Sequence, residues 1–104
     1  MLFLVHWELN ESMPEPQRLE AAQKLTASGL FPPAGVNVVR WDGTPENWGV
    51  LILEADNAAD VFRAVGLWRV AGAGFFKSVK TAPAMPLQEL IPIAGEMVQA
   101  VASA

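Results

Sequence analysis

The sequence predicts one small α+β domain, and three observations support this fold class. The chain has 104 residues, which can form one compact hydrophobic core. Short runs of β-branched, aliphatic and aromatic residues alternate with segments whose apolar residues recur at helical spacing. Glycine, proline and polar residues separate these runs. The predicted order is strand, helix, strand, strand, helix, strand, followed by a helical tail.

The first strand and the first helix are predicted within residues 2–29. Residues 2–8 contain neither glycine nor proline and are rich in strand-forming side chains. Ser12 is followed three residues later by Glu15, which matches a capping box at the start of a helix. That helix carries an apolar stripe and is expected to end at Gly29.

The middle of the chain predicts a hairpin and a second helix. Residues 36–41 and 48–54 have strand composition, and the segment DGTPEN between them has the composition of a turn. Asp56 is a suitable N-cap for the next helix, which Gly72 is expected to end. Its apolar stripe includes Trp68, for which we expect core packing or a place in a pocket wall.

A fourth strand and a helical tail complete the pattern. The strand is expected at residues 75–81, before the breaker sequence APAMP. Residues 87–101 place leucine, isoleucine, methionine and valine on one helical stripe. The predicted division is a domain of residues 1–82 and a helical extension of residues 83–104. This extension would pack either on its own domain or on a dimer partner.

The element order is that of the ferredoxin-like βαββαβ plan, which has a four-stranded antiparallel sheet in the strand order 4-1-3-2. Its helices cover one face of the sheet, so the other face would ordinarily carry polar residues at alternate positions. The strands predicted at residues 2–8 and 48–54 are instead apolar on both sides. A symmetric homodimer that packs two such sheets face to face would cover the second apolar face.

Composition narrows the expected partners and cofactors. Acidic residues outnumber basic ones by 11 to 7, and the basic residues are scattered, so we expect no binding to nucleic acid. With no cysteine and one histidine, no metal site is expected, and no motif calls for a cofactor. The opening apolar run lacks a basic leader and is too short to span a bilayer, which predicts a cytoplasmic protein without membrane contact.

Three short motifs resemble a family of small bacterial proteins, domain-of-unknown-function family 3303. They are the opening LFLVHWE, the pair Arg40 and Trp41 in the second strand, and LEADNA at the end of the third. The resemblance covers about the first three quarters of the chain, and the sequence departs from the family pattern after Thr81. It implies the dimeric α+β barrel fold. The wider superfamily includes small monooxygenases without cofactor, lactone isomerases and stress proteins, which implies a small-molecule pocket by analogy.

The predicted topology gathers candidate site residues at one end of the sheet. His6 is the candidate catalytic residue, because it alone titrates near neutral pH and a neighbouring cation would favour a neutral general base. Cationic side chains could bind a carboxylate, and aromatic rings would form an apolar wall. The predicted ligand-binding residues are Trp7, Arg40, Trp41, Trp48, Phe76 and Lys77. Which of them share a face depends on the strand register, because a slip of one residue exchanges the two faces.

Structural roles for the same residues stay open. His6 could be a partly buried histidine bonded to its neighbours, and Arg40 could stack on tryptophan at a dimer seam. Two functions are therefore expected as alternatives. The first is binding, or transformation without a cofactor, of a small apolar or carboxylate-bearing molecule in a pocket near the end of the sheet. The second is a non-catalytic dimerisation or regulatory interaction module. No nucleophile with a partnered base is recognisable, so the sequence leaves enzymatic activity undecided.

Overall fold

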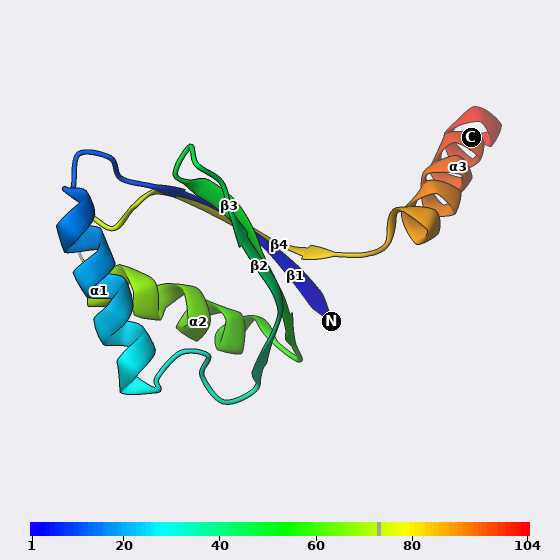
Figure 1. Ribbon diagram of the computed structural model, residues 1–104. Coiled ribbons are helices and arrows are strands. Elements are labelled where there is room, and N and C mark those ends of the chain that lie inside the picture. Colours follow the sequence, from blue (N-terminus) through cyan, green and yellow to red (C-terminus); the bar gives the residue numbers. More distant parts are fainter. Residues whose placement is uncertain (73) are drawn as a thin grey trace.

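The computed structural model describes residues 1–72 and 74–104, which form a four-stranded sheet and three helices (Figure 1). The strands are β1 (Leu2–Leu9), β2 (Val36–Gly43), β3 (Trp48–Ala55) and β4 (Phe76–Ala84). The helices are α1 (Glu15–Ser28), α2 (Ala58–Ala71) and α3 (Leu87–Ser103). This order confirms the predicted ferredoxin-like βαββαβ plan with an additional C-terminal helix.

The sheet has the order β2-β3-β1-β4 with antiparallel neighbours, which is the predicted order read from the other edge. In the register, Val5 pairs with Leu51 and Thr81, and His6 pairs with Val50 and Lys80. A bulge interrupts the pairing of β2 with β3 between residues 38 and 40. Strand β4 continues three residues past the predicted end and includes Pro83. This position tolerates proline because β4 is an edge strand that pairs with β1 alone.

Helices α1 and α2 lie on the same face of the sheet, which we call the covered face (Figure 1). The core forms on this face because alternate residues of β1 and β3 point toward the helices. Leu53 is fully buried there, and Val61, Ala64 and Val65 of α2 pack over it. A second cluster joins Leu25, Trp68 and Phe75 between α1 and α2. On the opposite side of the sheet, the open face, no helix of the described residues lies (Figure 1).

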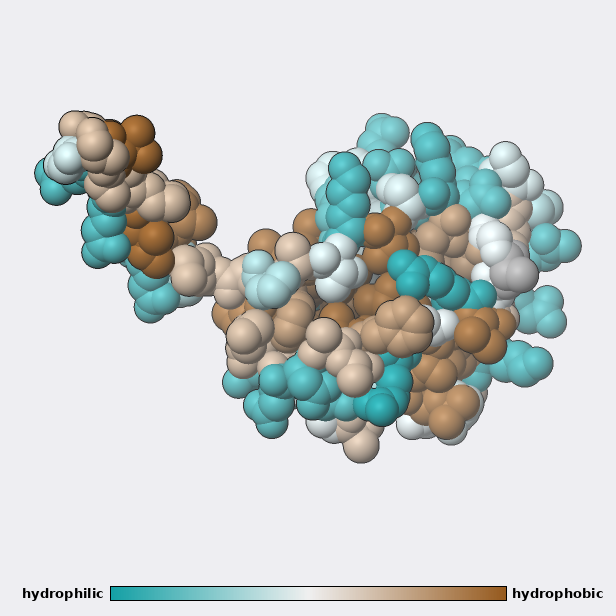
Figure 2. Space-filling view, turned by 180° about the vertical axis from the view of Figure 1, so that it is seen from behind, coloured by the Kyte–Doolittle hydropathy of each residue, from teal (hydrophilic) through white to brown (hydrophobic). Residues whose placement is uncertain are grey.

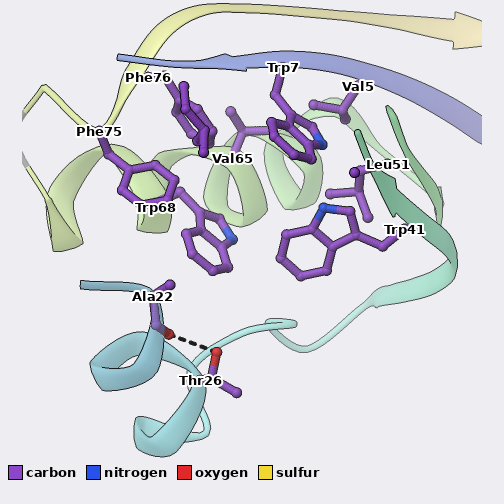
Figure 3. A pocket seen from close by; sticks show the side chains of 12 residues that line it. Val5, Trp7, Ala22, Thr26, Trp41, Leu51, Val65, Trp68, Phe75 and Phe76 are labelled. Carbon is purple, nitrogen blue, oxygen red and sulfur yellow. Dashed lines mark hydrogen bonds between the residues drawn. The ribbon is translucent and has the colours of Figure 1, made fainter. Parts of the chain in front are cut away.

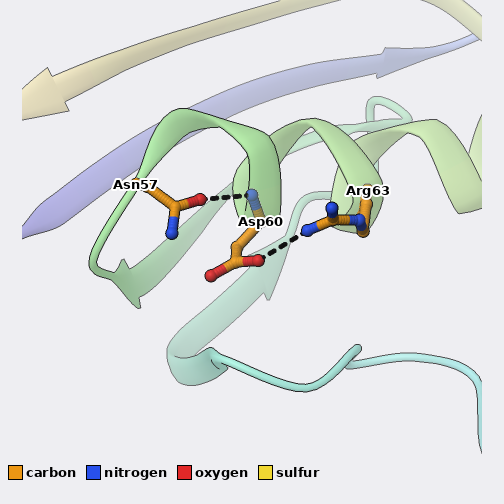
Figure 4. Close-up of polar contacts among 3 residues, drawn as sticks. All are labelled: Asn57, Asp60 and Arg63. Carbon is orange, nitrogen blue, oxygen red and sulfur yellow. Dashed lines mark hydrogen bonds and ion pairs between the residues drawn. The ribbon is translucent and has the colours of Figure 1, made fainter.

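The start of α2 differs by one residue from the sequence prediction. Its N-cap is Asn57, whose Oδ1 accepts a hydrogen bond from the backbone N–H of Asp60 at 2.9 Å (Figure 4). Asp60 in turn accepts a hydrogen bond from Arg63 at 2.7 Å. The predicted cap, Asp56, lies in the connection because β3 extends to Ala55. Both side chains suit a cap, so the end of the strand decides which one serves.

The start of α1 also differs from the predicted capping box. The N-cap position is Pro14, which makes no side-chain hydrogen bond. The backbone N–H of Ser12 donates to Oδ1 of Asn10 at 3.0 Å and forms a local turn. Ser12 therefore belongs to the connection, and Pro16, in the first turn of α1, has the fixed φ that suits the start of a helix. The end of α1 is as predicted, because Gly29 adopts the left-handed conformation there.

Helix α3 projects away from the rest of the chain (Figures 1 and 2). None of its residues is buried, and its apolar side chains are exposed, including Val98 and Val101. The Cα radius of gyration is 17.0 Å, whereas a compact domain of this length has about 13 Å. The extension is expected from the sequence to pack on its own domain or on a dimer partner. No residue of α3 is buried against its own domain. Among the described residues, no helix is long and apolar enough to cross a membrane.

Candidate functional site

The register divides the predicted site residues between the two faces of the sheet. Trp7, Trp41 and Phe76 lie on the covered face. His6, Arg40 and Trp48 lie on the open face, because each alternates with a residue of the covered face. Lys77 is largely exposed near the start of β4, with its Nζ 4.0 Å from Oε2 of Glu8. The topology therefore brings these residues to one end of the sheet but does not join them in one site.

A cavity of about 420 Å³ lies on the covered face, between the sheet and the two helices (Figure 3). Its size falls within the range of roughly 300–1,000 Å³ that is usual for small-ligand pockets. The lining residues come from β1, β2, β3, β4, α1, α2 and the segment before β4. They are Val5, Trp7, Leu9, Ala22, Thr26, Trp41, Gly43, Leu51, Val65, Trp68, Phe75 and Phe76. The described lining residues carry no ionisable side chain.

Five aromatic side chains line this cavity, three of them tryptophans. Trp41 meets Trp68 edge to face, with ring centroids 5.3 Å apart and planes at 83°. Trp68 also contacts Phe75, at 5.5 Å between centroids. Thr26 supplies a hydroxyl on the α1 side, and this group donates to the carbonyl of Ala22 at 2.7 Å (Figure 3). Such a surface favours planar, apolar ligands, because aromatic rings gain from edge-to-face and stacked contacts.

Gly49 makes room for Trp7 in this wall. A Cβ atom at position 49 would overlap both the carbonyl oxygen of Asp42 and the ring carbon Cζ2 of Trp7. At Gly43 a Cβ atom would stand 3.4 Å from Cη2 of the same ring, which is an ordinary contact. Gly49 therefore allows the indole to lie directly against β3, and this contact directs the ring along the cavity wall.

The open face holds a separate group of residues around His6. The ring centroids of His6 and Trp48 lie 5.6 Å apart, with the two planes tilted by 32°. The Nδ1 atom of His6 is buried and has no hydrogen-bond partner. Leu4, with 43% of its surface exposed, continues the apolar surface along β1. His6 thus lies on an apolar sheet face, on the other side of the sheet from the cavity.

Arg40 is paired with a carboxylate on its own strand. Its Nε donates to Oδ2 of Asp42 at 2.5 Å, and both side chains are largely exposed. This hydrogen bond, together with the charge of Asp42, raises the pKa of the Arg40 guanidinium above its ordinary value. The register places Arg40 on the open face, and it does not line the cavity. Among the described residues, no three His, Asp or Glu side chains lie together where they could hold a metal ion.

Arg18 is a buried residue that the sequence analysis did not single out. It is 7% exposed, and its Nη1 donates to the carbonyl of Asn10 at 3.0 Å and to that of Met13 at 2.5 Å. The backbone N–H of Asn10 also donates to the carbonyl of Phe75. Arg18 thus anchors the connection from β1 to α1 beside the aromatic wall. Nothing in the sequence pattern distinguishes it from an exposed helical arginine.

The fold and the cavity define a ferredoxin-like α+β domain with an aromatic pocket between its helices and its sheet. The chain belongs to the domain of unknown function family DUF3303, whose family model matches residues 1–98. The match includes most of α3, which corrects the expectation that the sequence departs from the family after Thr81. The apolar tail is therefore part of the family pattern over most of its length.

One solved structure with a similar chain is the crystal structure of protein Atu4242 from Agrobacterium tumefaciens, a structural genomics target. It is 14% identical in sequence, and the alignment covers 83% of this chain and 93% of that chain, with a TM-score of 0.46. No curated protein matches the sequence.

Proposed function

We propose that this protein binds a small apolar molecule in the aromatic cavity between the sheet and helices α1 and α2. The observation that carries this proposal is the size of the cavity together with its lining of tryptophan and phenylalanine. A ligand there would replace water against a surface that offers few hydrogen bonds, which favours apolar compounds. Because the described lining residues carry no ionisable side chain, the cavity supports binding rather than acid–base chemistry.

The proposal is tested by filling the cavity from its α1 side. We would titrate the protein with the neutral fluorophore N-phenylnaphthylamine and follow the rise in its emission. The variant Thr26→Trp places a large ring at the cavity wall and is expected to weaken binding by about tenfold or more. Ala27→Trp, at an exposed position of the same helix outside the lining, is the matched control. Equal binding by both variants would contradict the proposed site.

We further propose that the open face forms a homodimer, the second function expected from the sequence. The support is an apolar surface at the centre of the sheet, where Leu4 lies between Ile52 and Ala82 of the neighbouring strands. The unpartnered Nδ1 of His6 lies on the same face. A second copy packed against this face would cover the exposed apolar surface around Leu4, as in aligned sheet packing.

Sedimentation velocity over a range of protein concentrations tests the dimer. Leu4→Asp places a charge at the centre of the proposed interface and is expected to shift the protein to monomer. Leu19→Asp, at an exposed leucine of α1, is the control and is expected to keep the dimer. A wild-type protein that sediments as a monomer at all concentrations would refute the proposal.

A further inference from the structure

Helix α3 exposes an apolar stripe along most of its length. No residue of the helix is buried by the described part of the chain. Its polar residues lie along a different side of the helix from its apolar ones (Figure 2). An exposed apolar surface of this kind marks a site of interaction. The large side chains of the stripe recur at helical spacing, and they are Leu87, Leu90, Ile91, Met97, Val98 and Val101.

The connection between β4 and α3 holds the helix away from its own domain. Only Met85 and Pro86 separate the last residue of the strand from the first residue of the helix. Pro86 has the angles φ −56° and ψ 140° of an extended chain. Proline also keeps the residue before it out of the helical conformation. The two residues therefore carry α3 beyond the end of the sheet, where its stripe is available to another chain (Figure 1).

A groove between α2 and the edge strand β4 offers a surface of matching shape. It has a volume of about 310 Å³ and is lined mostly by apolar residues. One of them is Phe62, which is 71% exposed. The lining residues of α2 extend from Ala58 to Arg69, or about 17 Å at the rise of an α-helix. The stripe of α3 is about 21 Å long by the same measure, so the two helices can pack side by side.

Charge complementarity favours the groove of a second copy as the partner of α3. The charged side chains of α3 are Glu89 and Glu96, and the helix contains no basic residue. Arg69 lines the groove, and among the described residues it forms no ion pair. An α3 that runs antiparallel to α2 brings Glu89 close to Arg69. Two copies of α3 would instead bring only carboxylates together, and membrane surfaces attract basic amphipathic helices.

We propose that α3 of one copy docks in the groove between α2 and β4 of a second copy, with α3 antiparallel to α2. This inference rests on the homodimer proposed above and gives it a second contact, separate from the open face. Each copy supplies one helix and one groove, so a reciprocal exchange in a two-fold dimer leaves neither of them without a partner.

Disulfide crosslinking is a specific test because the chain has no cysteine. The arrangement that pairs Glu89 with Arg69 places Val98 near Phe62, since each lies roughly two turns further along its helix. The variant Phe62→Cys is mixed with a longer, tagged Val98→Cys chain under mild oxidation. We expect a disulfide between the two different chains to form about tenfold faster than in the control mixture. The control replaces Phe62→Cys by Leu19→Cys, at an exposed leucine of α1.

Other crosslinked products would identify other partners of α3. A disulfide within the double variant Phe62→Cys/Val98→Cys, without a mixed product, would show that the helix folds onto its own groove. Preferential linkage of Val98→Cys to itself would show that two α3 helices pair. Either result, or a mixed product that forms no faster than the control, would overturn the proposed docking.

Sedimentation velocity separates this inference from the open-face contact. Phe62→Glu is expected to weaken the dimer by about tenfold or more. Val70→Glu, at an exposed position of α2 outside the groove, is the matched control and should retain the dimer. If the wild type dimerises and these two variants dimerise equally, the docking of α3 is wrong and the open-face contact stands. If Leu4→Asp stays dimeric while Phe62→Glu dissociates, the docking stands and the open-face contact is wrong. A monomeric wild type at all concentrations refutes both.

Discussion

Replacing Gly49 by alanine is expected to destabilise the domain and to displace Trp7 from the cavity wall. The added Cβ would overlap the backbone carbonyl of Asp42 on β2 and the ring of Trp7. The first collision involves backbone of the adjacent strand, so relief requires β2 and β3 to separate or to shift. Overpacking of a core costs about 1–3 kcal/mol, and a collision with backbone places this substitution near the upper end. The unfolding free energy should therefore fall by about 3 kcal/mol.

Urea and thermal unfolding followed by circular dichroism measure this loss. In a domain of this size each kcal/mol lowers the midpoint by roughly 4–8 °C, so Gly49→Ala should melt at least about 12 °C below the wild type. Gly43→Ala is the matched control, because its Cβ would meet Trp7 at an ordinary 3.4 Å. Its unfolding free energy should stay within about 0.5 kcal/mol of the wild type. A Gly49→Ala variant as stable as this control would refute the packing argument for Trp7.

Three further predictions concern parts of the fold that position the cavity or extend beyond it, and thermal unfolding at low protein concentration checks each. Arg18→Ala should cost about 2 kcal/mol, because two carbonyls lose a buried donor; an unchanged melting temperature would show that water replaces the guanidinium. Asn57→Ala should lower the unfolding free energy by about 1 kcal/mol, because α2 loses its N-cap. Asp56→Ala should leave it unchanged. A larger loss for Asp56→Ala than for Asn57→Ala would show that Asp56 is the cap. Truncation after Pro86 should change the unfolding free energy of the dilute protein by no more than about 0.5 kcal/mol relative to the full chain, because no residue of α3 is buried. A larger loss would mean that the helix packs on its own domain.

The fold could be predicted from the sequence because each element carries a local signal. Strand composition, turn residues and helical stripes give the βαββαβ order, and the antiparallel order of the sheet follows from that plan. Element boundaries were less predictable. Asp56 and Asn57 are equally good caps, and only the length of β3 selects the second. The packing of α3 could not be predicted, because an apolar stripe is the same whether it meets its own domain or another chain.

The candidate site was predictable in composition but not in arrangement. His6 and Trp7 are neighbours in the sequence and lie on opposite faces of the sheet. Because β1 is apolar on both sides, its pattern does not indicate which face the helices cover. The sequence predicts Trp7, Trp41 and Phe76 as ligand-binding residues, and all three line the cavity. Arg18 had no detectable signal, since its role depends on two carbonyls that only the folded connection brings to it.

Both edges of the sheet are poor templates for adding further strands. On β4, Pro83 lacks an N–H group, and Lys77 and Lys80 place positive charges beside the free edge. On β2, the bulge between residues 38 and 40 breaks the regular spacing of the outer hydrogen-bonding groups. Such features oppose edge-to-edge association of sheets. A chain that exposes apolar side chains on one sheet face and on α3 is thereby protected against growth into open-ended fibrils through its sheet edges.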